Sequence, residues 1–266
     1  MSDRVRAKKS LGQHFLANRA VAFRIVGALS GEAMGQVIEI DPGMGVLTGS
    51  LLERFGDRLK VVEIDGESVA YLGEHFPALE GRILHEDFLR LDLARLGPGP
   101  FSVIGNFPYN ISSQILFHLL SYRDQVHEIV GMFQREVARR IVSGPGSKEY
   151  GILSVLMGAY FKGEYLFTVD ENEFRPPPKV KSGVVRFVRN DTTSLICKPE
   201  TLHRVVKMAF NQRRKTLRNA LSAIWSETLE DSGLGSLRAE QLGVAEFAEL
   251  GRRVELAQSV LPENAG

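Results

Sequence analysis

The sequence lacks several features that would place the protein in a specialised class. Its 266 residues include one cysteine, Cys197, so neither a disulfide nor a cysteine zinc site is possible within the chain. No stretch approaches the roughly 20 consecutive apolar residues that cross a bilayer. The basic N-terminus is not followed by the apolar segment of a secretion signal. We therefore expect a soluble, cytoplasmic protein.

An excess of charge of one sign is also missing, because the formal net charge is only +1. Any surface for nucleic acid must therefore come from local clustering of basic residues. Hydrophobic residues make up 44% and charged residues 24% of the chain, which is ordinary for a globular protein. The length suits one large domain, or a large and a small one, and we find no internal repeats.

A glycine-containing turn follows the first apolar run of the chain. Residues 37–40 lead into Gly43 and Gly45, and a helical pattern comes next. Glycines at such a turn let the backbone approach a ligand closely. The next apolar run begins at Leu59 and ends at Glu63, roughly 20 residues after the glycines, where an acidic side chain suits two ribose hydroxyls. The third glycine of the dinucleotide fingerprint is missing, which indicates a smaller nucleoside cofactor.

Two further apolar runs end in polar side chains that can contact a ligand. Residues 82–85 precede Asp87, which can accept a hydrogen bond from an adenine amino group or simply be an exposed turn residue. Residues 101–105 lead to Asn106, and a fifth run covers 127–133. Such strand ends in regular succession predict an α/β domain with ligand contacts at the carboxyl ends of its strands.

The stretch from Asn106 to Tyr109 fits chemistry on the amino group of a nucleobase. The amide oxygen of Asn106 and the carbonyl oxygen of Pro108 can accept its two N–H bonds, which favours a more nucleophilic, pyramidal nitrogen. The ring of Tyr109 can stack on the base, an interaction worth about 1–3 kcal/mol in nucleic-acid sites. The competing interpretation is a proline-containing turn with Tyr109 packed on the surface.

Each of three further features, one aromatic and two basic, also has two interpretations. Phe174, before a proline-rich loop, can stack on the second face of a base or anchor that loop in the core. Residues 207–219 carry five basic side chains and no acid, which suits phosphate contacts or a solvated face. The basic arm, with Arg4, Arg6, Lys8 and Lys9 in residues 1–10, is otherwise a solvated tail.

The chain divides where its composition becomes polar. Residues 189–200 are polar, so we place a domain boundary there and expect domains at 1–190 and 191–266. Asn18 is the predicted N-cap of an early helix, and residues 150–160 are apolar enough for a buried helix. The part after the boundary is helical in pattern.

Several of these segments, taken in order, resemble the KsgA/RsmA family of bacterial ribosomal RNA small-subunit adenine dimethyltransferases. Any one of them is a weak signal, but the ordered set is highly specific. The matching segments are Ser10 to Leu16, Glu39 to Thr48, Val62 to Asp65, Glu86 to Leu89, Asn106 to Ser112, Phe133 to Arg140, Phe174 to Val185 and Phe210 to Asn219.

The resemblance implies a class I methyltransferase domain, Rossmann-like, with a small all-helical C-terminal domain. It implies S-adenosylmethionine as methyl donor and dimethylation of N6 on two adjacent adenosines near the 3′ end of 16S rRNA. The expected partner is a 30S assembly intermediate and the expected state a monomer.

The resemblance also carries over site residues, position by position. Those expected to contact the target amine or base are Asn106, Pro108, Tyr109 and Phe174. The cofactor contacts would be Gln13, His14, Leu16, Glu39, Asp41, Gly43, Gly45, Glu63, Ile64, Asp87, Phe88 and Asn106. RNA contacts in the second domain would be Arg213, Arg214, Lys215 and Arg218. No metal site is expected.

Asp41 departs from the family pattern, which has glycine at this position. A carboxylate here lies near the expected carboxylate of the methionine moiety, and like charges in a partly buried site repel. We therefore predict weaker cofactor binding than with glycine. The opposite possibility is that Asp41 accepts a hydrogen bond from the α-amino group of the cofactor.

Three alternatives for the function stay open at this point. One is an erythromycin-resistance type methyltransferase acting on 23S rRNA, which the basic arm and the block at 210–219 disfavour. Another is a DNA adenine methyltransferase, which typically has Asp-Pro-Pro-Tyr instead of Asn-Phe-Pro-Tyr. The third is a ribosome-assembly factor that binds RNA with little catalytic turnover, an option that Asp41 keeps open.

Overall fold

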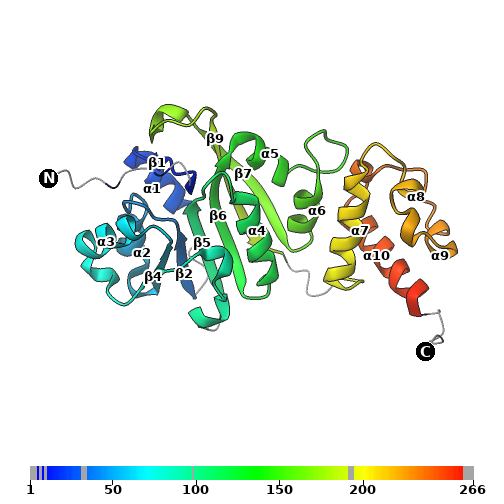
Figure 1. Cartoon of the computed structure of the whole chain (residues 1–266), viewed down its shortest axis with the longest axis horizontal. Helices are drawn as coiled ribbons and strands as arrows, with labels where there is room; N and C mark the ends of the chain where they lie inside the picture. Colours follow the sequence, from blue (N-terminus) through cyan, green and yellow to red (C-terminus); the bar gives the residue numbers. More distant parts are fainter. Residues whose placement is uncertain are drawn as a thin grey trace. The chain divides into compact units, whose positions relative to one another are not determined.

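The computed structural model describes residues 5, 8, 11–30, 35–97, 99–190 and 195–259. Three residues of the basic arm (Arg4, Arg6 and Lys9), Ser10 of the first family segment and residues 191–194 near the predicted boundary lie outside this set. The chain forms two compact units (Figure 1). The first comprises Met1–Arg139 with Lys162–Arg189, and the second comprises Arg140–Phe161 with Asn190–Gly266.

A seven-stranded sheet forms the centre of the first unit, in the order β4-β3-β2-β5-β6-β9-β7 (Figure 1). The neighbours from β4 to β6 are parallel, and β9 runs antiparallel to β6. The strands are β2 (Gln36–Ile40), β3 (Leu59–Glu63), β4 (Ile83–His85), β5 (Phe101–Asn106), β6 (Val126–Gln134), β7 (Phe161–Val169) and β9 (Ser182–Arg189). The predicted α/β fold is confirmed. The central strands are nearly continuous apolar runs because both of their faces are buried.

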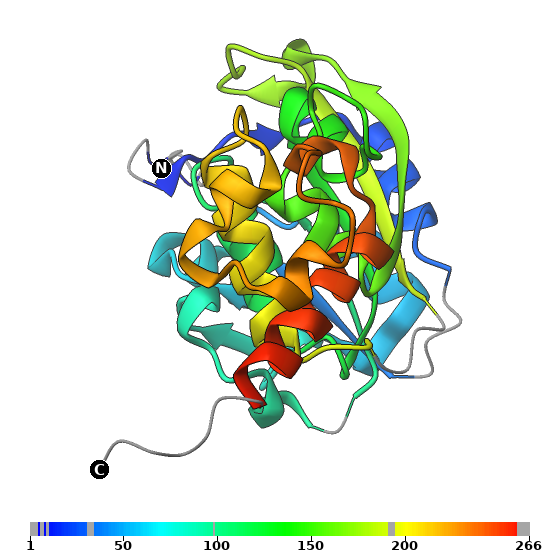
Figure 2. The ribbon, with the colours of Figure 1, turned by 90° about the vertical axis from the view of Figure 1, so that its right-hand side faces the viewer.

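The second unit is built from helices. These are α6 (Ile152–Gly158), α7 (Pro199–Asn211), α8 (Leu217–Ala220), α9 (Glu227–Glu230) and α10 (Val244–Ser259). Helices α7 and α10, yellow and red in Figure 2, pack against each other. Phe210 contacts both Tyr150 and Phe247, with ring centroids 5.9 Å and 5.8 Å apart. The buried helix predicted within 150–160 is confirmed as α6.

Residues 140–161 belong to this second unit, although they lie before the boundary predicted at residue 190. The reason is packing: α6 buries Leu153, Val155, Leu156 and Met157 and contacts both α7 and α10. The polar composition near residue 190 marks one crossing between the units. The crossing near residue 140 has no comparable signal, because α5 (Arg135–Ile141) runs through it as a continuous helix.

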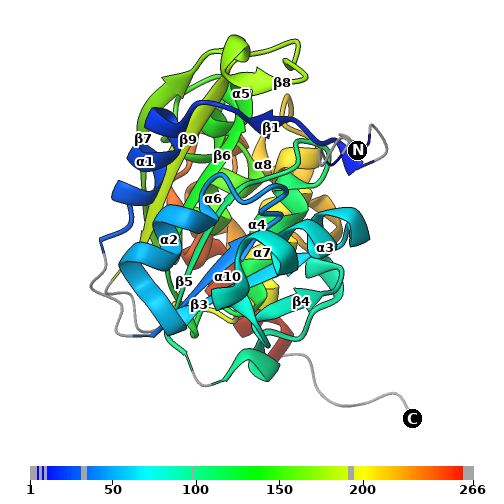
Figure 3. The same ribbon diagram turned by 90° about the vertical axis from the view of Figure 1, so that its left-hand side faces the viewer.

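The helices of the first unit follow its strands in the order that the sequence pattern predicted. They are α1 (Arg19–Gly27), α2 (Thr48–Phe55), α3 (Gly66–His75), α4 (Ser112–Ser121) and the beginning of α5. Asn18 is the N-cap of α1, and its side chain accepts from the backbone N–H groups of Ala20 and Val21. Helices α1 and α2 pack side by side (Figure 3). No helix in the described ranges is long and apolar enough to cross a membrane.

A separate two-stranded sheet joins the start of the chain to the segment before β9. Strand β1 (Phe15–Leu16) pairs antiparallel with β8 (Phe174–Arg175), and the two lie side by side in Figure 3. The backbone N–H of Ala17 extends this pairing with a 2.7 Å bond to the carbonyl of Glu173. Strands of two residues have no sequence period to detect, so this pairing was not predicted. It fixes the position of the residues just before β1.

Candidate active site

The carboxyl ends of the parallel strands bring the polar residues from four separate segments to one edge of the sheet. Ile40 is in register with both Val62 and Gly105, and Glu63 is in register with His85. The residues that follow these positions therefore come together.

Three hollows lie along this edge, and each is named here by one residue that lines it. The Ile64 hollow also contacts Gln13, Asp41, Asp87, Phe88 and Pro108 and has a volume of about 160 Å³. The Tyr109 hollow is small, about 20 Å³, and contacts Gln13, His14, Asp41, Gly43, Glu63, Asn106 and Pro108. The Phe76 hollow is the largest of the three, about 760 Å³, and contacts Leu16, Glu39, Asp41, Gly45 and Asn106.

The turn after β2 has a left-handed backbone at three positions: Asp41 (φ 51°), Gly43 (φ 56°) and Gly45 (φ 76°). A Cβ atom on Gly43 would lie 2.7 Å from the ring of Phe15, and one on Gly45 would lie 2.4 Å from the ring of Phe76. Both glycines are therefore required by conformation and by space. Asp41 is the one non-glycine residue with positive φ in the described chain, and aspartate is among the residues that adopt this conformation at modest cost.

Asp41 also lies in an acidic environment. Burial, together with the carboxylates of Glu63 and Asp87, raises the pKa of Asp41 to about 8. Its backbone N–H donates to the carbonyl of Val62 at 3.0 Å, which ties the start of the turn to β3. A free protein near neutral pH therefore holds Asp41 largely protonated, and a cationic ligand would favour its ionised form.

Glu63, at the end of β3, is 1% exposed and is held by two backbone groups. Its Oε2 accepts from the N–H of Gly43 at 3.1 Å, and its Oε1 accepts from the N–H of Asp65 at 2.8 Å. Burial raises the pKa of Glu63. A carboxylate so oriented keeps lone pairs on both oxygens for a pair of hydroxyl donors, which fits a ribose.

Glu39, at the end of β2, is also buried, and it accepts from the hydroxyl of Thr48 at 2.7 Å. Burial is the main cause that raises the pKa of Glu39 to about 8. Its carboxyl lines the Phe76 hollow. The Thr48 bond fixes it against the start of α2.

The Ile64 hollow combines an apolar wall with a carboxylate. Ile64 is 42% exposed although it is a large apolar side chain. Phe88, another apolar residue that lines the hollow, is only 4% exposed. The Oδ1 of Asp87 accepts from the N–H of Leu89 at 3.0 Å, which fixes this carboxylate beside the hollow. An apolar surface beside an acceptor suits an adenine ring with its amino group. The donor and acceptor set of the Ile64 and Tyr109 hollows therefore fits an adenosine moiety.

Asn106 has a fixed orientation. Its Nδ2 donates to the backbone carbonyl of His14 at 2.8 Å. Because that carbonyl can only accept, the amide oxygen of Asn106 must point away from it and remains an acceptor for another group. The carbonyl of Pro108 accepts from the N–H of Ile111 at 3.1 Å and has a second lone pair. The two acceptors proposed from the sequence are thus present together in the Tyr109 hollow.

The ring of Tyr109 is held by its neighbours on two elements. It stacks on the ring of His14, with centroids 5.6 Å apart, and its hydroxyl bonds to the hydroxyl of Ser182. His14 is itself held through its Nδ1, which lies 2.9 Å from the carbonyl oxygen of Pro176. The segment before β1 therefore closes over Asn106 and Tyr109.

Phe174 does not join this group. Its side chain is fully buried, in the core cluster that also contains Leu16, Met132 and Val184. It lines none of the three hollows, and no face of its ring is open to a base. Pairing of β8 with β1 puts Phe174 opposite the buried Leu16, so the second interpretation, a loop anchor in the core, describes this structure.

Another predicted cofactor residue, Gln13, comes from the segment at the start of the chain. The Oε1 of Gln13 accepts from the N–H of Lys8 at 2.8 Å. The Nζ of Lys8 lies 2.5 Å from Asp65 Oδ1 and 3.1 Å from Glu67 Oε1. Lys8, assigned only to a basic arm from the sequence, thus ties the segment to the residues after Glu63.

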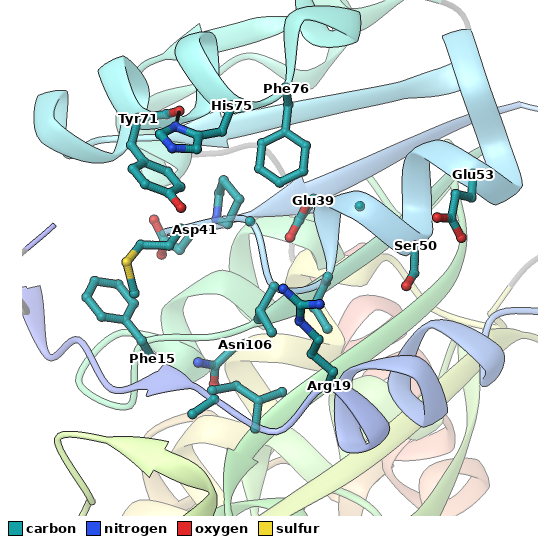
Figure 4. Close-up of a pocket in the computed structure, with 18 residues that line it drawn as sticks. Phe15, Arg19, Glu39, Asp41, Ser50, Glu53, Tyr71, His75, Phe76 and Asn106 are labelled. Carbon is teal, nitrogen blue, oxygen red and sulfur yellow. Dashed lines mark hydrogen bonds between the residues drawn. The ribbon is translucent and has the colours of Figure 1, made fainter. Parts of the chain in front are cut away.

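The Phe76 hollow contains residues that sequence reasoning missed. Figure 4 shows the rings of Tyr71, His75 and Phe76 on one side of it, with Phe15, Asn106 and Arg19 on the other. The rings of Tyr71 and His75 stack at 3.8 Å between centroids. Their four-residue spacing on a helix was a usable signal, because such residues share one face.

The four basic residues predicted for RNA contact lie in the second unit and differ in their surroundings. Arg213 lies 3.6 Å from Glu240 and donates to the carbonyl of Ser147, and Arg218 is paired with Glu230. Arg214 and Lys215 are exposed, and neither takes part in an ion pair with any described residue. Only two of the four cations are therefore unpaired.

The chain is similar to known proteins over most of its length. The family described as ribosomal RNA adenine dimethylase matches residues 4–234. "Ribosomal RNA small subunit methyltransferase A" of Parabacteroides distasonis is 52% identical over 264 residues, covering 98% of each protein.

Two solved structures show the same fold at lower identity. A dimethyladenosine transferase from Plasmodium falciparum has a TM-score of 0.76 at 23% identity and covers 89% of this chain and 96% of its own. The 23S rRNA methyltransferase ErmE has a TM-score of 0.68 at 24% identity and covers 91% and 99%.

Proposed function

The chain belongs to the ribosomal RNA adenine dimethylases, and from that premise we propose how and on which RNA it acts. It is a methyltransferase that uses S-adenosylmethionine. We propose that it dimethylates N6 of two adjacent adenosines near the 3′ end of 16S rRNA. The name of the relative from Parabacteroides distasonis, a small-subunit enzyme at 52% identity, supports this substrate over 23S rRNA.

In this proposal, the residues at the ends of β3 and β4 hold the adenosine part of the cofactor. Glu63 accepts from the ribose hydroxyls, Asp87 accepts from the adenine amine, and Ile64 packs on the ring. S-adenosylmethionine supplies a methyl group already activated on a sulfonium sulfur. The protein therefore needs to position the amine and needs no strong base to ionise it.

Asn106 and Pro108 act on the target amine. Their oxygens accept its two N–H bonds, and the nitrogen lone pair is thereby freed from the ring and directed at the methyl carbon. The lone pair forms the N–C bond while the C–S bond breaks with its electron pair left on sulfur. The amine then releases its surplus proton to water. Tyr109 offers its ring for stacking on the base.

The observation that carries this mechanism is the hydrogen bond from Asn106 Nδ2 to the carbonyl of His14. It fixes which end of the amide is presented to the substrate. A rotated amide would point N–H groups at an amine, which would repel the target. The segment before β1 therefore orients the acceptor.

The second unit would contact the phosphate backbone through Arg214 and Lys215. The target bases have to leave their stack to reach Asn106, which costs a few kcal/mol unless the RNA is already open. An incompletely assembled small subunit in the cytoplasm offers such RNA. We therefore propose that a monomer acts on an assembly intermediate and that its release accompanies maturation.

The test is transfer of radiolabelled methyl groups from S-adenosylmethionine to under-methylated 30S subunits, with mature 30S subunits as control. Nucleoside analysis should find N6,N6-dimethyladenosine at adjacent sites near the 3′ end of 16S rRNA. Methylation of a 23S fragment instead would overturn the substrate. Binding to the 30S particle without incorporation would favour an assembly factor with little turnover.

A further inference from the structure

The three hollows at the carboxyl edge of the sheet share a single side chain. Asp41 lines the Ile64 hollow, the Tyr109 hollow and the Phe76 hollow, and no other described residue lines all three. Its backbone is left-handed, with φ 51°, so its side chain is held at the turn and not on a regular strand. Figure 4 shows Asp41 at one end of the Phe76 hollow, between the Tyr71 side and the Phe15 side.

The chemistry of the hollows fixes which part of a ligand passes Asp41. The Ile64 hollow suits adenine, and Glu63 beside it suits the ribose. The larger Phe76 hollow shares only Asp41 with the Ile64 hollow among the described lining residues and has room for an amino-acid chain. In S-adenosylmethionine the atom between adenosine and amino acid is the sulfonium sulfur. The junction of the hollows is therefore where the positive charge of the donor would lie.

The carboxyl groups of Asp41, Glu63 and Asp87 face this junction. The charges of Glu63 and Asp87 disfavour ionisation of Asp41 in the free protein. Asp41 takes part in no ion pair with any described residue. A ligand with a positive charge at the junction would relieve this repulsion, whereas a neutral ligand of the same shape would not.

We propose that Asp41 makes this site select the charged methyl donor over its demethylated, uncharged-sulfur product. The proposal rests on the proposed function, because it assumes S-adenosylmethionine as the donor. Dimethylation needs more than one donor for each adenosine, so the product must leave and be replaced. A carboxylate that favours only the sulfonium form would promote this exchange.

The expected size follows from a single charge pair. An opposite charge within about 4–6 Å typically shifts a carboxyl pKa by 1–3 units, and one unit corresponds to a tenfold change in the binding ratio. We therefore expect Asp41 to change the ratio of dissociation constants, product over donor, by about tenfold.

Isothermal titration calorimetry of the full chain at pH 8.5 tests this proposal with three probes. They are S-adenosylmethionine, S-adenosylhomocysteine, and sinefungin, which carries an ammonium group in place of the sulfonium methyl. The variants are Asp41→Asn, which keeps the size of the side chain, and Asp41→Gly, which relieves the left-handed backbone. Glu74→Gln is the matched control, because Glu74 is an exposed carboxylate on α3 that lines none of the three hollows.

The wild type and Glu74→Gln should bind the donor and sinefungin more tightly than the product. Both Asp41 variants should lower the product-to-donor ratio about tenfold, with sinefungin following the donor. Asp41→Gly should change the ratio by the same amount as Asp41→Asn, because both variants remove the carboxylate.

An unchanged ratio in both Asp41 variants would overturn the proposal. That result is expected if Asp41 only accepts from the α-amino group, which donor and product share. A change of the same size in Glu74→Gln would also overturn it, because the effect would then come from the overall charge of the protein and not from Asp41. If the wild type binds none of the three probes, the proposed function itself fails, which is a different result.

Discussion

The carboxyl edge of the sheet and the basic segment of the second unit were both predicted as binding sites from short polar motifs, but their side chains have different partners in the structure. At the sheet edge, Glu63, Asp87 and Asn106 each have an orientation fixed by a backbone group within the same unit. In the basic segment, Arg213 and Arg218 are paired with acidic side chains, while Arg214 and Lys215 are exposed. Backbone groups hold a side chain for an incoming ligand, whereas an acidic partner competes with the ligand.

The largest effect is expected from Asn106→Ala. Loss of both the acceptor and the bond to the His14 carbonyl should lower kcat by about a hundredfold to a thousandfold, as for other fixed polar groups at a reacting centre. Single-turnover methylation of under-methylated 30S subunits measures this. Asn172→Ala, which changes an exposed asparagine, is the control. A fall of less than tenfold would mean that the fixed amide is not what activates the amine.

The second effect separates backbone strain from crowding at the sheet edge. Gly43 and Gly56 have nearly equal φ values, 56° and 55°, but only Gly43 is crowded, since no described atom lies within 4 Å of a Cβ on Gly56. Gly56→Ala should cost about 1–2 kcal/mol of unfolding free energy and leave cofactor binding unchanged. Gly43→Ala should in addition weaken binding by about tenfold or more, because Phe15 must move.

Denaturant unfolding and calorimetric titration of the two glycine variants give these quantities. Equal cofactor dissociation constants for both would show that the contact between the turn and Phe15 does not shape the site. The part of the loss of unfolding free energy that comes from the left-handed backbone should be equal in the two variants.

The third effect concerns the two exposed cations of the second unit. The double variant Arg214→Ala, Lys215→Ala should weaken binding to 30S rRNA by about tenfold and lower the salt slope by about two, one for each phosphate contact. Arg213→Ala and Arg218→Ala should each change RNA affinity less, because their charges are already paired, and should cost at most about 1 kcal/mol of unfolding free energy. Filter binding over a range of salt concentrations measures the first quantity.

Lys162→Ala serves as the control in these measurements, since Lys162 is an exposed cation on β7. A larger loss of RNA affinity in Arg213→Ala than in the double variant would reverse the comparison. It would mean that ion pairs within the unit open when the RNA binds.

The smallest effect is a pH dependence of cofactor binding. The pKa of Asp41 in the free protein is raised to about 8, so the carboxyl is mostly neutral below pH 8 and ionises above it. The described titratable or charged residues that line the same hollows as Asp41 are Glu39, Glu53, Glu63, Asp87, His14, His75, Tyr71, Tyr109 and Arg19. A cationic ligand favours the ionised form, so affinity for S-adenosylmethionine should rise about threefold to tenfold from pH 7 to pH 9.

Asp41→Asn should flatten this rise, which calorimetric titration at several pH values can detect. The same raised pKa gives an opposite sign for folding: the stabilising contribution is complete below the ordinary aspartate pKa and is lost as pH rises through 8. The thermal unfolding midpoint of Asp41→Asn should therefore exceed that of the wild type most clearly at pH 9. An affinity that falls with pH in the wild type would contradict the assignment of the cation to Asp41.

The sequence by itself determined the sheet edge to a large extent. Apolar runs that end in Gly43, Glu63, Asp87 and Asn106 were sufficient, because a buried parallel strand gives a continuous apolar signal and its end follows at once. The N-cap at Asn18 and the helix within 150–160 were read from equally local signals. In this fold, a residue that follows a parallel strand in the sequence also lies at the carboxyl edge of the sheet, so the order of residues predicts its position.

Only the tertiary structure decided the rest. The pairing of β1 with β8 buried Phe174 and positioned the His14 carbonyl against Asn106, and two-residue strands carry no period. Packing of α6 on α7 and α10 moved residues 140–161 into the second unit. Acidic partners distant in sequence neutralised Arg213 and Arg218. Each outcome depends on which surfaces meet in space, and a pattern within one segment does not contain that information.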